Sequence, residues 1–513
     1  MYDSNYLANH LRAASVDRDD ALYAEMLDGT TLSYGEMFDA AEKNASTLLI
    51  AGLQPGDCVA AQVEKSIESI QLYLGTVLAG GIFLPLNIAY TPSELEYFLT
   101  DAKPRIFVCD PTKLSVLQPL ANNSGVARVL TLSADGTGTL IDTLPANNEN
   151  FSAVARNKDD LAAFLYTSGT TGRSKGAMLS HANLASNAQS LKDCWYFSER
   201  DVLIHALPIF HTHGLFVATN TTLCAGSSMI FMPRFDSDII LSLMKKATVL
   251  MGVPTFYVRL LETANLSRDT VANMRLFISG SAPLLAETHK QWQAVTGTAI
   301  LERYGMTETN MNTSNPYDGE RRAGTVGMPL PGVEVRVANQ DTGKELAQGE
   351  IGSVEVRGPN VFKGYWQMPE KTKEEFRDDG FFITGDIGVI DEKNYLSIVG
   401  RSKDLIISGG FNVYPKEIEL ILDDIEGVYE SAIIGVPHPD FGEGVLAIVV
   451  LEAGKSLNES NLKAILKEKI AAYKQPKNIF FVDELPRNTM GKVLKNNLRN
   501  DHNDNFKKNQ GNH

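Results

Sequence analysis

Apolar and polar positions along the first 400 residues follow two alternating patterns. Residues 33–49 carry apolar side chains on one helical face after Ser33, which is suited to cap a helix, and residues 66–79 are predicted as a second helix. Residues 58–63 and 105–110 are short apolar runs of the kind that form buried strands. Residues 91–102 begin with Thr-Pro and carry Glu three positions after the Thr, which is a capping-box pattern. This alternation predicts an α/β domain with layered sheets and helices and largely parallel strands.

The pattern changes after about residue 400 into a shorter series of elements. We predict two helices, at 415–424 and 459–473, and three strands, at 430–436, 445–452 and 478–485. These elements make a small α+β domain. The predicted organisation is therefore a large N-terminal domain over 1–402, a small mobile C-terminal domain over 403–500 and a polar, disordered tail over 501–513.

Composition and charge restrict the partners of the chain. It has 513 residues, of which 43% are hydrophobic and 21% charged, and its net charge is -15. A chain of this length needs more than one core. Because an acidic surface disfavours nonspecific binding to nucleic acid and to anionic membranes, we expect neither as a partner. Any anionic substrate then needs a local basic pocket.

The N-terminus and the cysteines indicate a cytoplasmic protein. The first 20 residues lack the apolar core of a signal peptide, and the chain has no run of 18 apolar residues. Four cysteines are scattered without a CxxC pair, which favours free thiols in a reducing compartment. We expect a cytoplasmic monomer or weak homodimer.

The stretch YTSGTTGRSKGAMLSH, residues 166–181, suits a polyphosphate. Glycines let backbone N–H groups turn toward a ligand, hydroxyl groups donate hydrogen bonds, and Lys175 adds positive charge. The stretch is not a Walker A loop, because Arg and Ser stand between Gly172 and Lys175. Taken alone, it could equally be a solvated hairpin.

The same stretch resembles the phosphate loop of the adenylate-forming superfamily, which includes acyl-CoA synthetases. The resemblance continues in order through LERYGMTET (301–309), RAGTVGMPLPG (322–332), FFITGDIG (381–388), GRSKDLIISGGFNVYPKEIE (400–419) and PRNTMGKVLK (486–495). It covers nearly the whole chain. It implies two half-reactions: a carboxylate attacks the α-phosphate of ATP to give an acyl-adenylate and diphosphate, and a thiol then displaces AMP.

The resemblance also implies roles for individual residues. The β- and γ-phosphates would be held by Thr167, Ser168, Gly169, Thr170, Thr171, Gly172 and Lys175. Further ATP-binding residues would be Ser281, Ala282, Glu302, Tyr304, Thr307, Asp386, Arg401 and Lys492. Among these, Tyr304 would stack on adenine, Asp386 with Arg401 would hold the ribose, and Thr307 would contact the α-phosphate.

Three residues are expected to take part in catalysis. Glu308 would ligate Mg²⁺ through an oxygen, as a hard cation prefers. Lys492 resembles the mobile lysine that contacts the substrate carboxylate and the α-phosphate, and Thr307 is the third. The alternative interpretations are that Glu308 caps a helix, Asp386 caps a turn and Lys492 is an ordinary lysine near the C-terminus.

A hinge would let one acyl group meet two different attacking groups in turn. Lys403 aligns with the hinge residue of the superfamily, and Gly409 and Gly410 would line the tunnel for the pantetheine of CoA. A rigid loop would have a similar composition.

The acid is less explicit in the sequence. We expect Arg234 to bind a second carboxylate from a buried pocket wall, with His211, Ser279 and Met306 also lining the pocket. The alternatives are that Arg234 lies on the surface and that the histidines only fill space. The run TETNMNTSNPYDG (307–319) is similar to malonyl-CoA synthetases. This similarity implies malonate, ATP and CoA as substrates, with methylmalonate as a secondary substrate.

Three other functions stay open. The chain could activate another short- or medium-chain acid, or it could load an acyl group onto a carrier protein. It could also be a nucleotide-binding regulator without catalysis, although Glu308, Asp386, Arg401 and Lys492 are all present.

Overall fold

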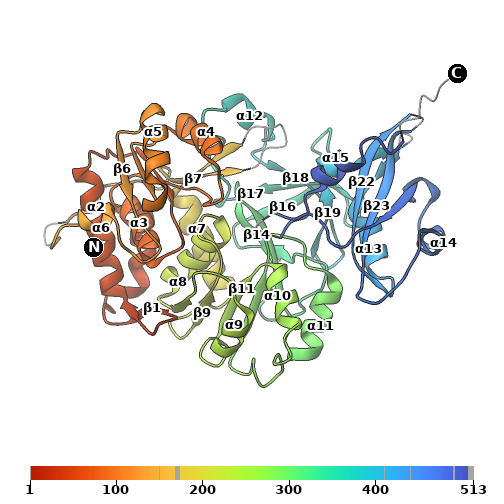
Figure 1. The fold of residues 1–513 in the computed structure, drawn as a ribbon, viewed down its shortest axis with the longest axis horizontal. Helices are drawn as coiled ribbons and strands as arrows, with labels where there is room; N and C mark the ends of the chain where they lie inside the picture. The colour runs from red at the N-terminus through yellow and green to blue at the C-terminus, as the bar shows by residue number, and fades with distance from the viewer. Residues whose placement is uncertain are drawn as a thin grey trace.

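Four β-sheets form the framework of the chain, and three of them belong to its larger part (Figure 1). The computed structural model describes residues 2–148, 151–167, 174–408, 411–439, 441–488 and 491–506. The predicted site residues outside this description are Ser168, Gly169, Thr170, Thr171, Gly172, Gly409 and Gly410.

The first sheet carries the hairpin that leads to the predicted phosphate loop. Its order is β6-β5-β3-β4-β7-β8, parallel throughout except for the final pair. The strands are β3 (Cys58–Gln62), β4 (Ile82–Pro85), β5 (Ile106–Cys109), β6 (Arg128–Thr131), β7 (Leu161–Thr167) and β8 (Lys175–Ser180).

The second sheet is the longest and has nine strands in the order β15-β14-β13-β12-β11-β9-β10-β1-β2. Its strands are β1 (Leu22–Met26), β2 (Thr31–Ser33), β9 (Val202–His205), β10 (Ser228–Phe231), β11 (Val249–Gly252), β12 (Leu276–Ser279), β13 (Leu301–Met306), β14 (Asn310–Ser314) and β15 (Met328–Pro329). The strands from β1 to β13 in this order pair in parallel, so the carboxyl ends of β12 and β13 lie at one edge. In open α/β sheets, ligands bind just beyond the carboxyl ends of the parallel strands.

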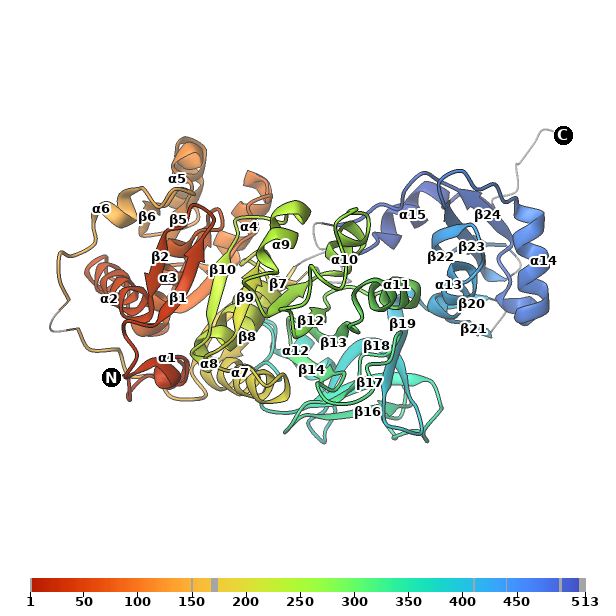
Figure 2. The same cartoon turned by 90° about the horizontal axis from the view of Figure 1, so that it is seen from below.

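The remaining two sheets are mainly antiparallel. The third contains β16 (Glu334–Ala338), β17 (Gly352–Arg357), β18 (Phe382–Ile390) and β19 (Leu396–Arg401). The fourth contains β20 (Ile406–Ser408), β21 (Phe411–Val413), β22 (Val428–His438), β23 (Gly442–Leu451) and β24 (Asn478–Phe481). Figure 2 shows the fourth sheet and its helices at one end of the molecule, in blue.

Local sequence signals explain where several helices begin. The longer helices are α1 (Tyr6–Arg12), α2 (Tyr34–Ile50), α3 (Ile67–Leu78), α4 (Pro92–Ala102), α5 (Leu114–Asn123), α7 (His181–Cys194), α9 (Ser237–Leu243), α10 (Pro254–Leu261), α11 (Ala286–Thr296), α13 (Pro415–Asp423), α14 (Glu459–Lys469) and α15 (Lys495–His502). The shorter ones are α6 (Thr139–Asp142), α8 (Asn220–Ala225) and α12 (Pro369–Glu374). Ser33, Ser66 and Thr91 cap α2, α3 and α4 with the reciprocal bonds of a capping box, so these predicted helix starts are confirmed.

The hydrophobic cores separate the two parts of the chain. The largest core extends to Leu396, whereas the cores on the two faces of the fourth sheet begin with Ile406 and Ala432. The predicted class, α/β layers followed by a smaller α+β unit, is confirmed. The boundary predicted between residues 402 and 403 falls between these cores and stays a prediction.

Residues 501–506 of the predicted polar tail belong to the described part of the chain. Helix α15 continues to His502, and Phe506 packs against His438 with ring centroids 4.7 Å apart. The contact between Phe506 and His438 of β22 depends on tertiary structure, so the polar composition of this segment could not indicate it. None of the described helices is long and apolar enough to cross a membrane.

Candidate active site

The β7–β8 hairpin places Thr167 and Lys175 opposite each other at the base of the predicted phosphate loop. Lys175 is only 7% exposed. Its Nζ forms an ion pair with Glu375 Oε1 at 2.9 Å and lies 4.1 Å from the ring centroid of Tyr365. A charge at the loop base is therefore fixed by a carboxylate and an aromatic face.

Glu308 lies beside this ion pair. The Tyr365 hydroxyl is 3.1 Å from Glu308 Oε1 and 2.7 Å from Glu375 Oε2, and Thr167 Oγ1 is 3.4 Å from Glu308 Oε1. Burial raises the pKa of the Glu308 carboxyl. Strand β13 and the turn after it thus bring Glu308 to the same place as the β7–β8 hairpin.

The charges around Glu308 fit a divalent cation bound together with phosphates. The Tyr365 hydroxyl joins the carboxylates of Glu308 and Glu375, Lys175 pairs with Glu375, and a triphosphate would add more negative charge. Among the described residues, no group of three or more His, Cys, Asp or Glu is placed to hold a metal alone. Magnesium is usually held by one or two carboxylates plus substrate phosphate oxygens, and Glu308 fits that requirement.

A second cluster joins β13 to the third sheet. Asp386 on β18 and Arg401 on β19 are cross-strand partners, and their side chains form an ion pair at 2.7 Å. The Tyr304 hydroxyl donates to the other oxygen of Asp386. The Asp386 backbone N–H donates to Thr384 Oγ1 at 3.0 Å, which fixes the turn of the TGD motif. Three predicted nucleotide residues therefore meet in one place.

Lys492 approaches this second cluster from the C-terminal unit. An isolated bridge between Arg487 and Val493 forms its hairpin, and a Cβ on Gly491 would lie 2.9 Å from Thr255 on α10. Lys492 as a whole residue is exposed. Its ammonium nevertheless lies close to protein groups, and the resulting loss of hydration, together with repulsion from Arg401, lowers its pKa to about 8. Perturbed groups of this kind cluster at functional sites.

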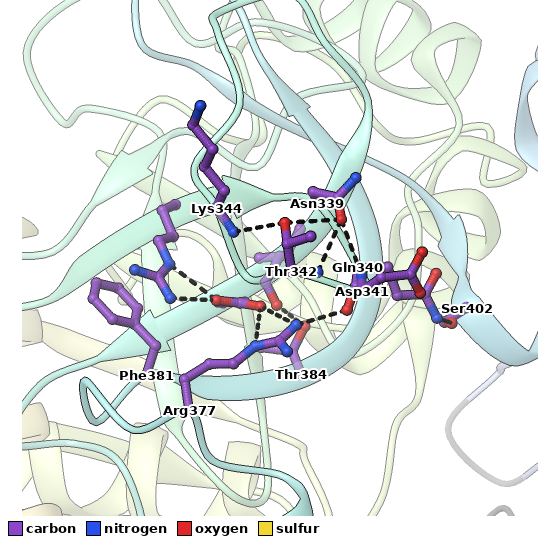
Figure 3. Close-up of polar contacts among 12 residues, drawn as sticks. Asn339, Gln340, Asp341, Thr342, Lys344, Arg377, Phe381, Thr384 and Ser402 are labelled. Carbon is purple, nitrogen blue, oxygen red and sulfur yellow. Dashed lines mark hydrogen bonds and ion pairs between the residues drawn. The ribbon is translucent and has the colours of Figure 1, made fainter.

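The predicted hinge is held from both sides. Ser402, Lys403 and Asp404 form a short 3₁₀ turn between the third and fourth sheets. Gln340 Nε2 donates to Ser402 Oγ at 2.8 Å (Figure 3). On the other side, Arg499 Nη2 of α15 donates to Asp404 Oδ1 at 2.6 Å. Lys403 is exposed and lies between Ser402, which contacts the larger part of the chain, and Asp404, which contacts the C-terminal part.

A buried carboxylate supports the Gln340 contact. Glu355 is fully buried and forms ion pairs with Arg336 and Arg377, each at 2.8 Å. Arg377 Nη2 also donates to the backbone oxygen of Gln340 at 2.9 Å, so it joins the Glu355 cluster to the turn that contacts Ser402 (Figure 3).

Of the predicted acid-pocket residues, Arg234 is placed differently from the expectation. It follows β10 in the loop before α9, and its side chain is exposed, so it is not a buried pocket wall. Ser279 at the end of β12 is 1% exposed, and burial lowers the pKa of His211 to about 4. Met306 is half-buried at the end of β13.

Arg303 is a buried cation that the sequence analysis missed. It is 3% exposed, and its Nε and Nη2 have no hydrogen-bond partner in the described part of the chain. Burial lowers the pKa of the guanidinium to about 9, so it stays charged at neutral pH. A Cβ on Gly280 would lie 2.4 Å from Arg303 Cζ, so the guanidinium packs against that glycine.

Further buried polar side chains lie near Arg303 and make a polar cluster with it. The buried Oγ of Ser279 and Nε2 of His211 and His213 have no partner among the described residues. His213 Nδ1 lies 3.1 Å from Ser281 Oγ, and Ser281 has φ of 73°, which is strained for a residue with a side chain. Buried charges are normally paired, so this polar cluster is suited to an anion. The sequence signal for it is an Arg inside the short strand LERYGM, next to Glu302.

The other predicted residues lie nearby on the same elements. Glu302 on β13 is buried, and its Oε1 lies 3.3 Å from His289 Nδ1. Ala282 and Thr307 are half-buried after β12 and β13. Consecutive residues of β13, whose side chains point to opposite faces, thus serve two clusters: Tyr304 contacts Asp386, and Arg303 lies in the polar cluster.

Two family models match the chain: AMP-binding enzyme over residues 9–366, and AMP-binding enzyme C-terminal domain over residues 417–492. The chain belongs to the AMP-binding enzyme family. It is an AMP-forming acid–CoA ligase, for which ATP and CoA are substrates.

Two of the relatives described below are named as CoA ligases, and the acids in their names differ. The ATP-bound crystal structure of MatB from Rhodopseudomonas palustris is 60% identical, with a TM-score of 0.96 over 98% of this chain and 100% of that chain. A malonate–CoA ligase from Arabidopsis thaliana is 33% identical over 92% of this chain and 85% of its own. A long-chain-fatty-acid–CoA ligase from Bacillus subtilis is also 33% identical, over 92% of this chain and 90% of its own.

The whole chain of this AMP-binding enzyme superposes better on the ATP-bound structure of MatB than on the apo structure. The apo crystal structure of the same MatB gives a TM-score of 0.86 at the same 60% identity and 98% coverage. This value is lower than the 0.96 of the ATP-bound structure.

Proposed function

We propose that the enzyme is a malonyl-CoA synthetase, which converts malonate, ATP and CoA into malonyl-CoA, AMP and diphosphate through malonyl-adenylate. The observation that carries this proposal is Arg303, a buried guanidinium with unpaired donors on the strand that also contacts the nucleotide cluster. A dicarboxylic acid can pair one carboxylate with Arg303 while the other reacts. The malonate–CoA ligase from Arabidopsis thaliana and the similarity to MatB support this choice of acid.

Arg303 would also reject monocarboxylic acids. A site built to bind a polar group leaves its own buried groups unpaired when the ligand lacks that group, and such sites can discriminate by about 10⁴-fold. Acetate and fatty acids would leave the guanidinium desolvated and without a partner. Methylmalonate keeps both carboxylates, and we propose it as a secondary substrate that Met306 restricts through contact with the added methyl group.

We propose the following roles for the nucleotide residues. Thr167 and Lys175, with Ser168, Gly169, Thr170, Thr171 and Gly172, bind the β- and γ-phosphates. Asp386 with Arg401 binds the ribose, and Tyr304, Ser281, Ala282 and Glu302 surround the adenine. Thr307 contacts the α-phosphate, and Glu308 supplies a carboxylate oxygen to Mg²⁺, which neutralises phosphate charge when it is bound.

In the first half-reaction, a malonate carboxylate oxygen attacks the α-phosphorus, and the bond to the diphosphate oxygen breaks. The reacting groups are both anionic, so positive charge placed between them stabilises the transition state. We propose that Lys492 supplies this charge by contacting the carboxylate and the α-phosphate. Its position beside Arg401 and Asp386 supports this role.

In the second half-reaction, the thiol of CoA attacks the acyl carbon and AMP leaves. We propose that the C-terminal unit rotates about Lys403, which removes Lys492 and brings Gly409 and Gly410 to the pantetheine. The contacts of Ser402 and Asp404 on either side of Lys403 would confine the rotation to that residue. The reaction needs neither nucleic acid nor a membrane, and the negative net charge disfavours binding to both. We keep the proposal of a cytoplasmic monomer or weak homodimer.

A screen of acids tests the proposal. Purified enzyme with Mg²⁺ and ATP would be given malonate, methylmalonate, succinate, acetate or octanoate, with CoA or with a carrier protein. We expect diphosphate release and thioester formation with malonate and CoA, and slower turnover of methylmalonate. Activity on octanoate without activity on malonate would select a fatty-acid ligase, and transfer only to the carrier protein would select a loading enzyme.

A further inference from the structure

Lys175 is paired with Glu375 in a closed arrangement. The Lys175 side chain is 9% exposed and the Glu375 side chain 21%, and their charged atoms are 2.9 Å apart. The ring of Tyr365 lies against the ammonium at 4.1 Å. Glu375 is therefore already paired with the ammonium group of Lys175, which would otherwise be available to bind an anion.

Glu375 has other partners that do not depend on Lys175. The Tyr365 hydroxyl is 2.7 Å from Glu375 Oε2, and Lys371 Nζ is 3.1 Å from Oε1. If Lys175 turned toward a phosphate, the Glu375 carboxylate would keep one hydrogen bond and one ion pair. The buried ammonium of Lys175, in contrast, needs either Glu375 or a phosphate as its partner, because an unpaired buried charge is destabilising.

We propose that Glu375 competes with the triphosphate for Lys175. It holds the ammonium when no phosphate is present, releases it when ATP enters, and takes it back as diphosphate leaves. The competition lowers the affinity for ATP and for diphosphate alike, which favours product release. This inference rests on the proposed placement of the triphosphate beside Lys175.

The test is the change Glu375→Gln, which keeps the shape of the side chain and removes its charge. ATP and diphosphate dissociation constants would be measured by calorimetry with Mg²⁺, without acid or CoA. We expect both ligands to bind about tenfold more tightly, since a tenfold change requires only a modest part of the energy of a half-buried ion pair. Unchanged or weaker binding would overturn the inference.

Glu374→Gln is the matched control. Glu374 is the next residue, its side chain is 66% exposed, and it contacts Lys371 at 3.0 Å. This variant should bind ATP as the unchanged enzyme does. An equal gain in both variants would mean that the surface charge of α12 acts, not competition for Lys175.

A double-mutant cycle with Lys175→Met separates competition from a general field. Lys175→Met should weaken ATP binding, and adding Glu375→Gln should then gain no more than the control does. A full tenfold gain without Lys175 would overturn the inference. If the unchanged enzyme binds no ATP, the proposed function itself fails, whereas normal binding without a gain in Glu375→Gln removes only this inference.

Discussion

Replacement of Arg303 provides the sharpest test of how the enzyme selects its acid. Methionine is a suitable replacement because it fills similar space without donors or charge, so Arg303→Met removes the anion partner with little change in packing. Arg303 is 3% exposed and packs against Gly280, so no solvent replaces a lost carboxylate contact. The free enzyme should not lose stability, because Nε and Nη2 of the guanidinium have no hydrogen-bond partner among the described residues.

The size of the effect follows from burial. Removing one partner of a buried charge pair costs about 3–5 kcal/mol, and each 1.4 kcal/mol is about tenfold. We therefore expect kcat/KM for malonate to fall by about 10²- to 10⁴-fold. The value for acetate should stay the same or rise, since acetate never used the guanidinium.

The assay measures diphosphate release with malonate and with acetate, together with ATP binding by calorimetry. Arg234→Ala is the control, because that arginine is exposed after β10. It should turn over malonate at a near-normal rate. Near-normal malonate turnover by Arg303→Met, with loss in Arg234→Ala, would refute the reasoning, and so would an equal loss of ATP binding in Arg303→Met.

Three further predictions concern the half-reactions. Because the pKa of Lys492 is about 8 and only the cation can contact both anions, kcat/KM for adenylation should fall about tenfold per pH unit above that value. Lys492→Ala should remove this fall at high pH, and an unchanged fall in that variant would assign it to another group. Lys403→Pro should leave diphosphate release near normal but slow thioester formation from supplied malonyl-adenylate at least tenfold, and equal loss in both assays would remove the hinge assignment. Glu308→Gln should raise the Mg²⁺ concentration needed for tight ATP binding by about tenfold or more, as loss of a ligand does, and an unchanged titration would place the metal elsewhere.

Elements with local signals were predictable from the sequence. The helices that begin after Ser33, Ser66 and Thr91 follow from capping chemistry, which involves neighbours within a few residues. The motif that holds Asp386 likewise carried its own signal, and the structure brings Asp386 to Arg401 by strand pairing.

Residues defined by tertiary contacts were not predictable in the same way. Arg234 and Arg303 both lie close to apolar runs, and only the folded structure shows that Arg303 is buried whereas Arg234 is exposed. Glu375 lies 200 residues from Lys175 in the chain, so no local pattern could indicate their ion pair. The same limit applies to Gln340, which contacts Ser402 across 62 positions.

Formation of the mixed anhydride between malonate and AMP is the measurement closest to the central claim. Enzyme, Mg²⁺, ATP and malonate would be mixed without CoA, quenched within one turnover and examined by mass spectrometry for malonyl-adenylate. The account predicts this species with malonate and at least about 10³-fold less acyl-adenylate with acetate, as expected for a site that leaves a buried guanidinium unpaired. Equal yields from acetate and malonate, or an adenylate with octanoate alone, would contradict it.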